Sequence, residues 1–237
     1  MTKLSVNINK IATLRNSRGS DTPNLVQTAI DIQEFGAQGI TVHPRPDERH
    51  IKYQDVYDLK PIVSTEYNIE GNPIPKFVDL VLANKPTQVT LVPDTIDTLT
   101  SNAGWDTITH LDFLTDVVTE FKRNNIRTSI FMNTDLARIE ATAKIGADRI
   151  ELYTEDFASQ YKKGYKKAIN PYIESALFAH NLGLGINAGH DLNLDNIAFF
   201  ADNIPNLLEV SIGHALISES LYLGLHNVIN MYLYRLK

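Results

Sequence analysis

The chain carries polar side chains suited to proton transfer and phosphate binding, and they cluster where short apolar runs end. Histidine has an ordinary pKa close to neutrality, so it can accept and release protons at pH 7, and an enclosed glutamate can be tuned into a base. Arginine side chains can clamp phosphate oxygens. The residues that follow these runs are Asn7, Asn9, Lys10, Arg15, Arg18, His43, Arg45, Arg49, His50, Glu70, Thr100, Glu151, Asn187, His190, Asp191, Gly213 and His214. The set predicts acid–base chemistry on a phosphorylated carbonyl compound.

The apolar runs have the composition of β-strands. Each is short, rich in Val, Ile, Leu, Thr or Tyr, and bounded by turn residues. Amphipathic stretches typical of helices lie between them, and Pro23 and Pro171 stand where helices would start. The predicted strands are 4–8, 39–43, 63–69, 88–92, 127–131, 149–153, 183–187 and 207–212. The predicted helices include 24–35, 74–83, 111–121, 135–144 and 171–182.

The order of these elements predicts a (β/α)8 TIM barrel. Strands that alternate with helices are parallel and joined by crossovers, and eight such repeats close a barrel. An open doubly wound sheet is the alternative, but it favours a Gly-rich dinucleotide fingerprint after its first strand, and this sequence has none. We expect one domain over residues 1–237, with extra helices in the long loops after strands 4 and 6, at 94–110 and 155–170. In barrels of this kind the functional groups lie at the carboxyl ends of the strands, where the polar set falls.

Composition limits the partners of the chain. The net charge of −6 argues against general nucleic-acid binding, which needs a broad basic surface, but it allows phosphate ligands held by a few local groups. The absence of cysteine excludes disulfides, thiolate metal sites and a cysteine nucleophile. The sequence shows neither a signal-peptide core at its amino terminus nor an apolar run long enough to span a bilayer. We therefore expect a cytoplasmic protein that acts on small molecules.

Four of the seven histidines fall on the predicted rim of the barrel, at positions 43, 50, 190 and 214. The others lie in predicted helices or in an insertion, where structural roles are the better expectation. The loops after strands 7 and 8 each pair a glycine with a rim histidine, and these two loops commonly form a phosphate cradle in barrels. Convergence of His, Arg and Glu from seven strands favours a catalytic site over a collection of loop caps.

Two long segments and several short ones resemble the pyridoxine 5'-phosphate synthase family. The long segments are residues 6–19, VNINKIATLRNSRG, and residues 39–51, GITVHPRPDERHI. The short ones are residues 68–70, 91–93, 150–151, 187–190 and 212–215. They occur in the family's order and cover nearly the whole chain.

The resemblance implies a barrel transferase of vitamin B6 biosynthesis that uses no metal and no organic cofactor. Its reaction would be the ring-closing condensation of 1-deoxy-D-xylulose 5-phosphate with 3-amino-2-oxopropyl phosphate, which gives pyridoxine 5'-phosphate, phosphate and water. Family members assemble into homo-oligomers, typically octamers, and the same state is expected here.

The family's pattern also implies roles for single residues. His43 and Glu70 would accept protons, His190 would donate one, and Glu151 would support charged transition states. The residues implied to bind the amino-ketone phosphate are Asn7, Arg18, Asp191, Gly213 and His214. Those implied to bind the deoxyxylulose phosphate are Arg45, His50 and Thr100.

Four positions depart from the commoner family pattern. Asn9 and Lys10 stand where Asp and His are common, Tyr153 stands where His is common, and Asp191 stands where Gly is common. Asparagine keeps the hydrogen bonding of Asp but loses its charge, and lysine cannot shuttle a proton at neutral pH as imidazole does. Asn9 and Lys10 remain candidate ligands of the deoxyxylulose phosphate, with Lys10 able to bind its phosphate group. At Asp191 a backbone contact carries over and a side-chain role does not.

Three other functions are compatible with parts of the pattern. A Schiff-base aldolase would use Lys10 as its nucleophile beside a cationic neighbour, but it would leave the rim His and Glu residues unexplained. A metal-dependent isomerase or hydrolase would use those residues as ligands, although the sequence has no His-x-His pair or close acidic cluster. A barrel that only binds a phosphorylated metabolite would not need His43, Glu70 and His190 together.

Overall fold

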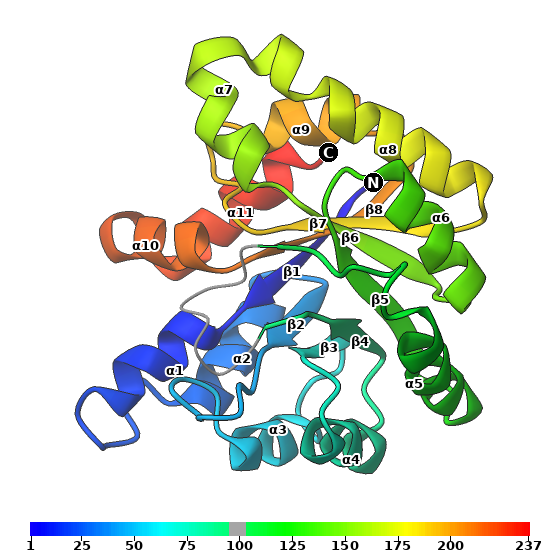
Figure 1. Cartoon of the computed structure of the whole chain (residues 1–237). Helices are drawn as coiled ribbons and strands as arrows, with labels where there is room; N and C mark the ends of the chain where they lie inside the picture. Colours follow the sequence, from blue (N-terminus) through cyan, green and yellow to red (C-terminus); the bar gives the residue numbers. More distant parts are fainter. Residues whose placement is uncertain (95–102) are drawn as a thin grey trace.

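Eight parallel strands close into a barrel in the computed structural model of this chain, which describes residues 1–94 and 103–237 (Figure 1). Each strand pairs with the next one along the chain, and the last pairs with the first. The predicted (β/α)8 fold is therefore confirmed. The strands are β1 (Lys3–Asn7), β2 (Gly39–Val42), β3 (Glu66–Gly71), β4 (Gln88–Leu91), β5 (Arg127–Met132), β6 (Arg149–Tyr153), β7 (Gly185–Gly189) and β8 (Leu207–Ile212).

Helices surround the strands and cover the outside of the barrel (Figure 1). Two of them begin at side-chain caps: Asn24 accepts a hydrogen bond from the backbone N–H of Gln27, and Asp135 accepts one from that of Arg138. No helix in the described ranges is both long and apolar enough to cross a bilayer. The helices are α1 (Asn9–Asn16), α2 (Leu25–Glu34), α3 (Tyr53–Leu59), α4 (Pro75–Asn84), α5 (Leu111–Arg123), α6 (Leu136–Ile145), α7 (Glu155–Ala168), α8 (Asn170–Asn181), α9 (Ile197–Asn203), α10 (His214–Leu223) and α11 (Leu225–Arg235).

Two strands begin later than the sequence predicts. β3 begins at Glu66 rather than at residue 63, because the backbone N–H groups of Ser64 and Thr65 donate to the side chain of Gln33 instead of to a neighbouring strand. β7 begins at Gly185 rather than at residue 183. Gly183 has φ of 81° and its N–H donates to the carbonyl of His180, so it ends α8 instead of opening a strand.

In the described part of the chain, the extra helices follow β1, β6 and β8. Helix α7 is the extra helix predicted after β6. In the loop after β4, residues 92–94 and 103–110 form turns and irregular structure, and the remainder lies outside the described residues. Helix α1 was not predicted, and two helices, α10 and α11, follow β8 where one was expected. The sequence of α1, NKIATLRN, is too polar to give a clear amphipathic pattern.

The strands direct polar side chains into the barrel. On β1, Leu4 packs in the core between sheet and helices, whereas Ser5 faces inward and shares a hydrogen bond with Thr41 of β2 (2.7 Å between the hydroxyl oxygens). Thr90 of β4 donates to the amide oxygen of Asn68 on β3 at 3.0 Å. Because side chains alternate along a strand, the residues that continue this inward row at the carboxyl ends face a common space. A layer of polar side chains inside the barrel thus lies next to the space at the carboxyl ends of the strands.

Candidate active site

A cavity of about 600 Å³ opens at the carboxyl ends of the strands. This is the end of the barrel where the sequence predicts a site. Acidic, basic and apolar side chains from strand ends and the loops beyond them share the cavity. Its lining consists of Asn7, Asn9, Lys10, Thr13, His43, Arg45, Arg49, His50, Glu70, Val92, Phe131, Glu151, His190, Asp191, Leu192, Ser211, Gly213, His214 and Ala215.

His43 and Glu70 face each other at the ends of β2 and β3. Nδ1 of His43 lies 3.9 Å from Oε2 of Glu70, and both side chains are almost buried. Burial lowers the pKa of His43 well below its ordinary value, and the positive charge of Arg45 adds to this effect. Burial raises the pKa of Glu70 well above its ordinary value, and the neighbouring Glu151 adds to it. Both groups therefore favour their neutral forms, and the neutral imidazole can accept a proton at pH 7.

Glu151 on β6 is the second buried carboxyl of the cavity. Its Oε2 atom is 3.5 Å from the hydroxyl of Thr90, and its Oε1 atom packs against Gly189 of β7. Burial raises the pKa of Glu151 to about 7. A carboxyl with that pKa can both release and take up a proton at neutral pH.

His190 follows β7 in a strained backbone conformation. Its φ is 74° and that of Asp191 is 53°, in the left-handed region that residues with a side chain seldom adopt. The hydroxyl of Thr154 donates to the backbone carbonyl of His190. The carboxylate of Asp191 is hydrogen-bonded to Nδ1 of the His190 imidazole. The ring of Tyr153 lies edge-on to the imidazole, with the ring centroids 5.1 Å apart. These contacts hold the imidazole at the cavity despite the strained backbone.

Basic side chains from α1 and from the loop after β2 form another wall. Arg45 is buried and paired with Asp94. Burial lowers the pKa of His50 to about 4, with a further contribution from the charge of Arg45, so His50 is neutral at pH 7. Its Nδ1 atom accepts the backbone N–H of Ile51 at 2.9 Å, which leaves the ring proton on Nε2. A guanidinium beside a neutral N–H donor suits a phosphate oxygen.

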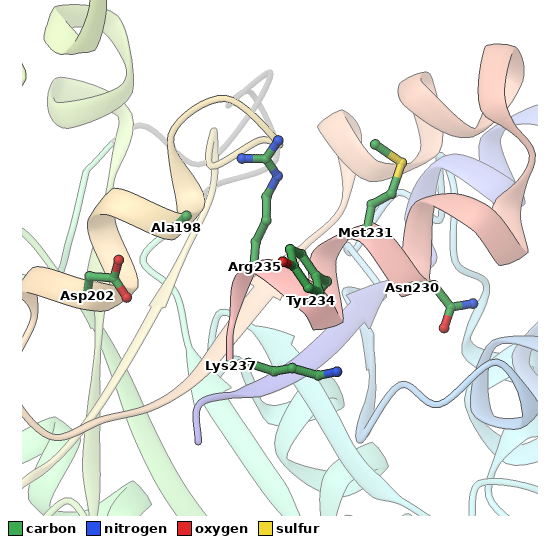
Figure 2. Close-up of a pocket in the computed structure, with 7 residues that line it drawn as sticks. All are labelled: Ala198, Asp202, Asn230, Met231, Tyr234, Arg235 and Lys237. Atoms are coloured by element: carbon green, nitrogen blue, oxygen red, sulfur yellow. The ribbon is translucent and has the colours of Figure 1, made fainter.

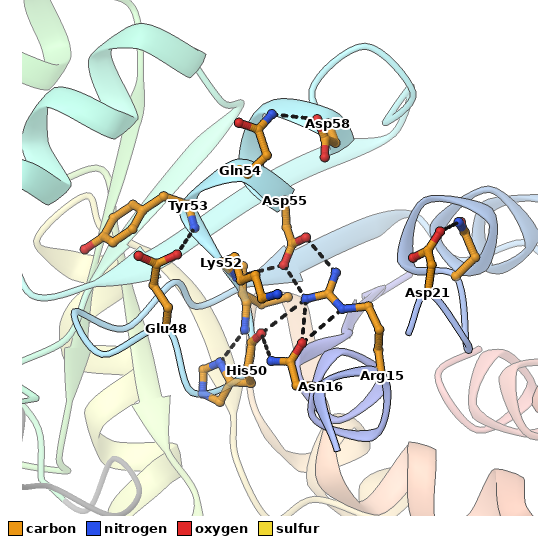
Figure 3. A network of polar contacts seen from close by, with 12 residues as sticks. Arg15, Asn16, Asp21, Glu48, His50, Lys52, Tyr53, Gln54, Asp55 and Asp58 are labelled. Carbon is orange, nitrogen blue, oxygen red and sulfur yellow. Dashed lines mark hydrogen bonds and ion pairs between the residues drawn. The ribbon is translucent and has the colours of Figure 1, made fainter. Parts of the chain in front are cut away.

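A polar network behind this wall fixes the loop that carries His50 (Figure 3). Arg15 of α1 forms a two-pronged ion pair with Asp55 of α3, with Nη1–Oδ1 and Nη2–Oδ2 distances of 2.6 and 2.8 Å. The side-chain amide of Asn16 donates to the carbonyl of His50 at 2.7 Å, and the backbone N–H of Lys52 donates to Asp55 at 2.7 Å. The residues on both sides of Ile51 are therefore tied to the α1–α3 pair.

The amino end of α10 reaches the cavity through Gly213 and His214. The first N–H groups of a helix have no partner within the helix, and its dipole favours an anion at this end. A Cβ built on Gly213 would lie 3.1 Å from the Cβ of Asn7, so the glycine lets the ends of β8 and β1 approach closely.

The whole chain matches a known protein family. The family model described as pyridoxal phosphate biosynthesis protein PdxJ matches residues 4–237. The chain belongs to the PdxJ family. It is 68% identical to the pyridoxine 5'-phosphate synthase of Flavobacterium johnsoniae and 62% identical to that of Christiangramia forsetii. Both alignments cover 237 residues, which is 100% of this chain and of each relative.

Solved structures share the barrel of this PdxJ-family chain at low sequence identity. Phosphoribosylanthranilate isomerase from Thermotoga maritima aligns with a TM-score of 0.62 and 14% identity, covering 100% of this chain and 98% of that one. The 3-keto-L-gulonate-6-phosphate decarboxylase from Vibrio cholerae aligns with a TM-score of 0.65 and 8% identity, covering 99% and 97%. At these identities the likeness concerns the fold alone.

The cavity of the PdxJ-family chain is lined by most of the site residues predicted from the sequence. Arg18 is exposed on the turn after α1 and does not line the cavity. Thr100 lies outside the described residues. The other residues given a role by the family resemblance, together with the candidate ligands Asn9 and Lys10, line it: Asn7, Asn9, Lys10, His43, Arg45, His50, Glu70, Glu151, His190, Asp191, Gly213 and His214.

Sequence reasoning left out several residues that line the cavity. Phe131 and Ser211 lie on the inward faces of β5 and β8, in register with Glu151 and Gly189. Two-residue periodicity along each strand could have placed both of them on the same inward row. The other unassigned lining residues are Thr13, Val92, Leu192 and Ala215, and the lining also includes Arg49 from the polar set.

A second cavity, of about 720 Å³, lies outside the barrel between α9 and α11 (Figure 2). Figure 2 shows α9, with Ala198 and Asp202, across from α11, with Met231 and Tyr234, and none of the described residues that line this cavity is His or Glu. Within the described ranges, no group of three or more His, Asp or Glu side chains is arranged to hold a metal ion. The barrel mouth is therefore the better candidate for acid–base chemistry in this family member.

Proposed function

We propose that this PdxJ-family chain is a pyridoxine 5'-phosphate synthase. The reaction condenses 1-deoxy-D-xylulose 5-phosphate with 3-amino-2-oxopropyl phosphate, closes the pyridine ring and releases phosphate and water. One observation carries the proposal: His43, Glu70, Glu151 and His190 line one cavity in a chain that is 68% identical, over its full length, to a protein of that name. The proposed reaction uses no metal and no organic cofactor.

The acid–base groups suit the proton transfers that this reaction needs. Amine addition to a ketone, dehydration and loss of phosphate all move protons within one enclosed site. His43 is neutral and accepts a proton. Burial favours the protonated form of Glu70, and the ammonium group of the amino-ketone phosphate would favour its ionised, accepting form. His190 donates a proton, and ionised Glu151 stabilises positive charge that develops on the substrates.

Two anchored phosphates would orient the reacting carbon atoms. We assign the deoxyxylulose phosphate to the basic wall with Arg45 and His50, and the amino-ketone phosphate to the amino end of α10 at Gly213 and His214. The additional ligands assigned to the first substrate are Asn9, Lys10 and Thr100. Those assigned to the second substrate are Asn7 and Asp191, and the family resemblance adds Arg18 from the turn after α1.

The proposal includes assembly into a homo-octamer and a cytoplasmic location, both of which rest on the resemblance of the sequence to the family. Sedimentation velocity of the purified protein would measure the assembly. A monomer over the concentration range of the activity assay would contradict the octamer.

A product assay tests the reaction directly. Chelator-treated protein would be mixed with 1-deoxy-D-xylulose 5-phosphate and freshly generated 3-amino-2-oxopropyl phosphate, and pyridoxine 5'-phosphate and inorganic phosphate would be followed by chromatography. Formation of both products without added metal supports the function and its independence of cofactors. Folded protein that binds both substrates but forms no product would instead favour a barrel that only binds phosphorylated metabolites.

The same assay can also test the Schiff-base aldolase alternative, because Lys10 lines the cavity as that alternative requires. Borohydride would be added during incubation with each ketone substrate, and the protein would be examined by mass spectrometry. A trapped adduct that disappears in Lys10→Ala would favour a Schiff-base aldolase. We expect no adduct at this residue.

A further inference from the structure

The backbone fixes which end of the Asn7 side-chain amide is oxygen and which is nitrogen. The N–H of Asn9 lies 3.0 Å from Oδ1 of Asn7. A backbone N–H only donates, so the atom that it contacts is the amide oxygen and the other end is the NH2 group. That nitrogen, Nδ2, lies 3.3 Å from Oε2 of Glu70. Asn7 therefore donates to the carboxyl oxygen that also faces His43.

The surrounding chain holds Asn7 in this orientation. The backbone of Gly213 packs against it so closely that a Cβ at position 213 would lie 3.1 Å from the Cβ of Asn7 and 3.3 Å from its Oδ1. The side chain of Asn9 accepts the backbone N–H of His43 at 3.0 Å. The turn that carries Asn7 is thus joined to the end of β2, beside the His43–Glu70 pair.

We propose that Asn7 is a positioning residue for Glu70, which it holds beside His43 and favours in its ionised form. This inference rests on the proposed function, in which Glu70 acts as a base. A hydrogen-bond donor stabilises a carboxylate more than it stabilises the protonated acid. Asn7 therefore opposes the effect of burial on Glu70, in addition to any contact that it makes with the substrate.

The other titratable groups around Glu70 come from four neighbouring elements. His43 ends β2, Asp94 follows β4, Glu151 lies on β6 and Glu209 lies on β8. Burial is the largest cause of the raised pKa of Glu70, and the three carboxylates add to it. The amide of Asn7, which donates from β1, is therefore placed where it opposes burial and these carboxyl groups.

Asn7→Asp tests the inference with almost no change in shape. Aspartate keeps the oxygen that accepts the N–H of Asn9, but it replaces the donor facing Glu70 with a second oxygen. We expect kcat at pH 7 to fall by at least about 10-fold, because loss of a positioned base costs about 10²- to 10⁴-fold. The acidic limb of the kcat profile should move to higher pH. KM for the deoxyxylulose phosphate should change by less than about 3-fold, whereas KM for the amino-ketone phosphate should rise, because Asn7 is also assigned to that substrate.

An NMR titration of Glu70 measures the effect of Asn7 on the pKa of this carboxyl group without relying on turnover. Protein labelled with carboxyl-¹³C glutamate would be titrated by NMR, with the Glu70 signal assigned by its loss in Glu70→Gln. The pKa of Glu70 should rise in Asn7→Asp and, in the same direction, in Asn7→Leu, which removes the donor without adding charge. Asn230→Asp is the matched control, because it adds the same charge on exposed α11 and should leave the titration unchanged.

The outcomes separate this inference from the proposed function. An unchanged Glu70 titration in folded Asn7→Asp and Asn7→Leu overturns the positioning role, as does a raised KM with an unchanged pH profile, which is the signature of substrate binding alone. If the native chain forms no pyridoxine 5'-phosphate, the proposed function fails, and the NMR titration still decides whether Asn7 controls Glu70.

Discussion

Glu151 occupies the space that a side chain at position 189 would need. A Cβ built on Gly189 would overlap Oε1 of Glu151 and would lie 3.1 Å from the carbonyl oxygen of Ser211. The two residues lie on adjacent strands, where Gly189 is paired with Tyr153. Because Gly189 on β7 has no Cβ, the carboxyl of Glu151 can lie inside the barrel mouth.

Gly189→Ala should displace the Glu151 carboxyl and lower kcat by about 10²-fold, because a shift of about 1 Å in a catalytic group can cost that much. Steady-state kinetics would measure the loss, and circular dichroism would check folding. Gly164→Ala is the control, since an added Cβ there meets nothing within 4 Å. Full activity of Gly189→Ala would show that Glu151 does not need its observed position.

Glu70→Gln should abolish turnover and leave substrate binding largely intact. Glutamine has nearly the same shape as glutamate, but it cannot accept and release a proton at neutral pH. The product assay would measure turnover, and isothermal titration calorimetry would measure binding of each substrate. Near-normal turnover would remove Glu70 from the role of obligatory base. Glu140→Gln on the exposed face of α6 is the matched control.

Glu151→Gln should make the protein more stable at pH 8. The pKa of Glu151 is raised from 4.5 to about 7, so the stabilisation of its neutral form is complete below pH 4.5 and is lost as the pH rises through about 7. Glutamine cannot ionise and avoids this loss. The expected gain in unfolding free energy is roughly 3 kcal/mol at pH 8 and shrinks toward zero near pH 4.5. Urea unfolding at both pH values would measure it, and a gain that does not depend on pH would contradict the mechanism.

Asp55→Asn should lower the unfolding free energy by about 3–5 kcal/mol, because it leaves the guanidinium of Arg15 without its charged partner. Each side chain of this pair is only 10% exposed. The pair Lys144–Glu140 is 64% and 50% exposed, so Glu140→Gln should change the unfolding free energy by less than about 1 kcal/mol. Denaturant unfolding of both variants would make the comparison. Equal effects would show that burial does not strengthen the Arg15–Asp55 pair.

Local sequence patterns are enough to predict the architecture and the end of the barrel that carries the site. Apolar runs alternating with amphipathic stretches predict strands joined by crossover helices, and the bounds of β6, residues 149–153, agree with the prediction. These signals are local. The fold needs apolar side chains on the helix-facing side of each strand and turn residues between the elements, and both can be recognised in short windows of sequence.

Bounds that depend on distant residues were missed. The start of β3 is set by the side chain of Gln33, about 30 positions earlier in the chain, which takes the N–H groups of Ser64 and Thr65. Helix α1 is a short polar helix, and Arg15 within it pairs with Asp55, 40 positions away. Neither contact leaves a periodic signal in the sequence near the element that it fixes.

The contacts between polar side chains depend on how the barrel closes. From the sequence, Asn7 and Asn9 are candidate ligands at the end of the first strand. In the folded chain, Asn7 donates to Glu70 and Asn9 accepts the backbone N–H of His43. The physical reason is range: a hydrogen bond needs its two atoms about 3 Å apart, and barrel closure rather than local sequence sets that distance between residues far apart in the chain.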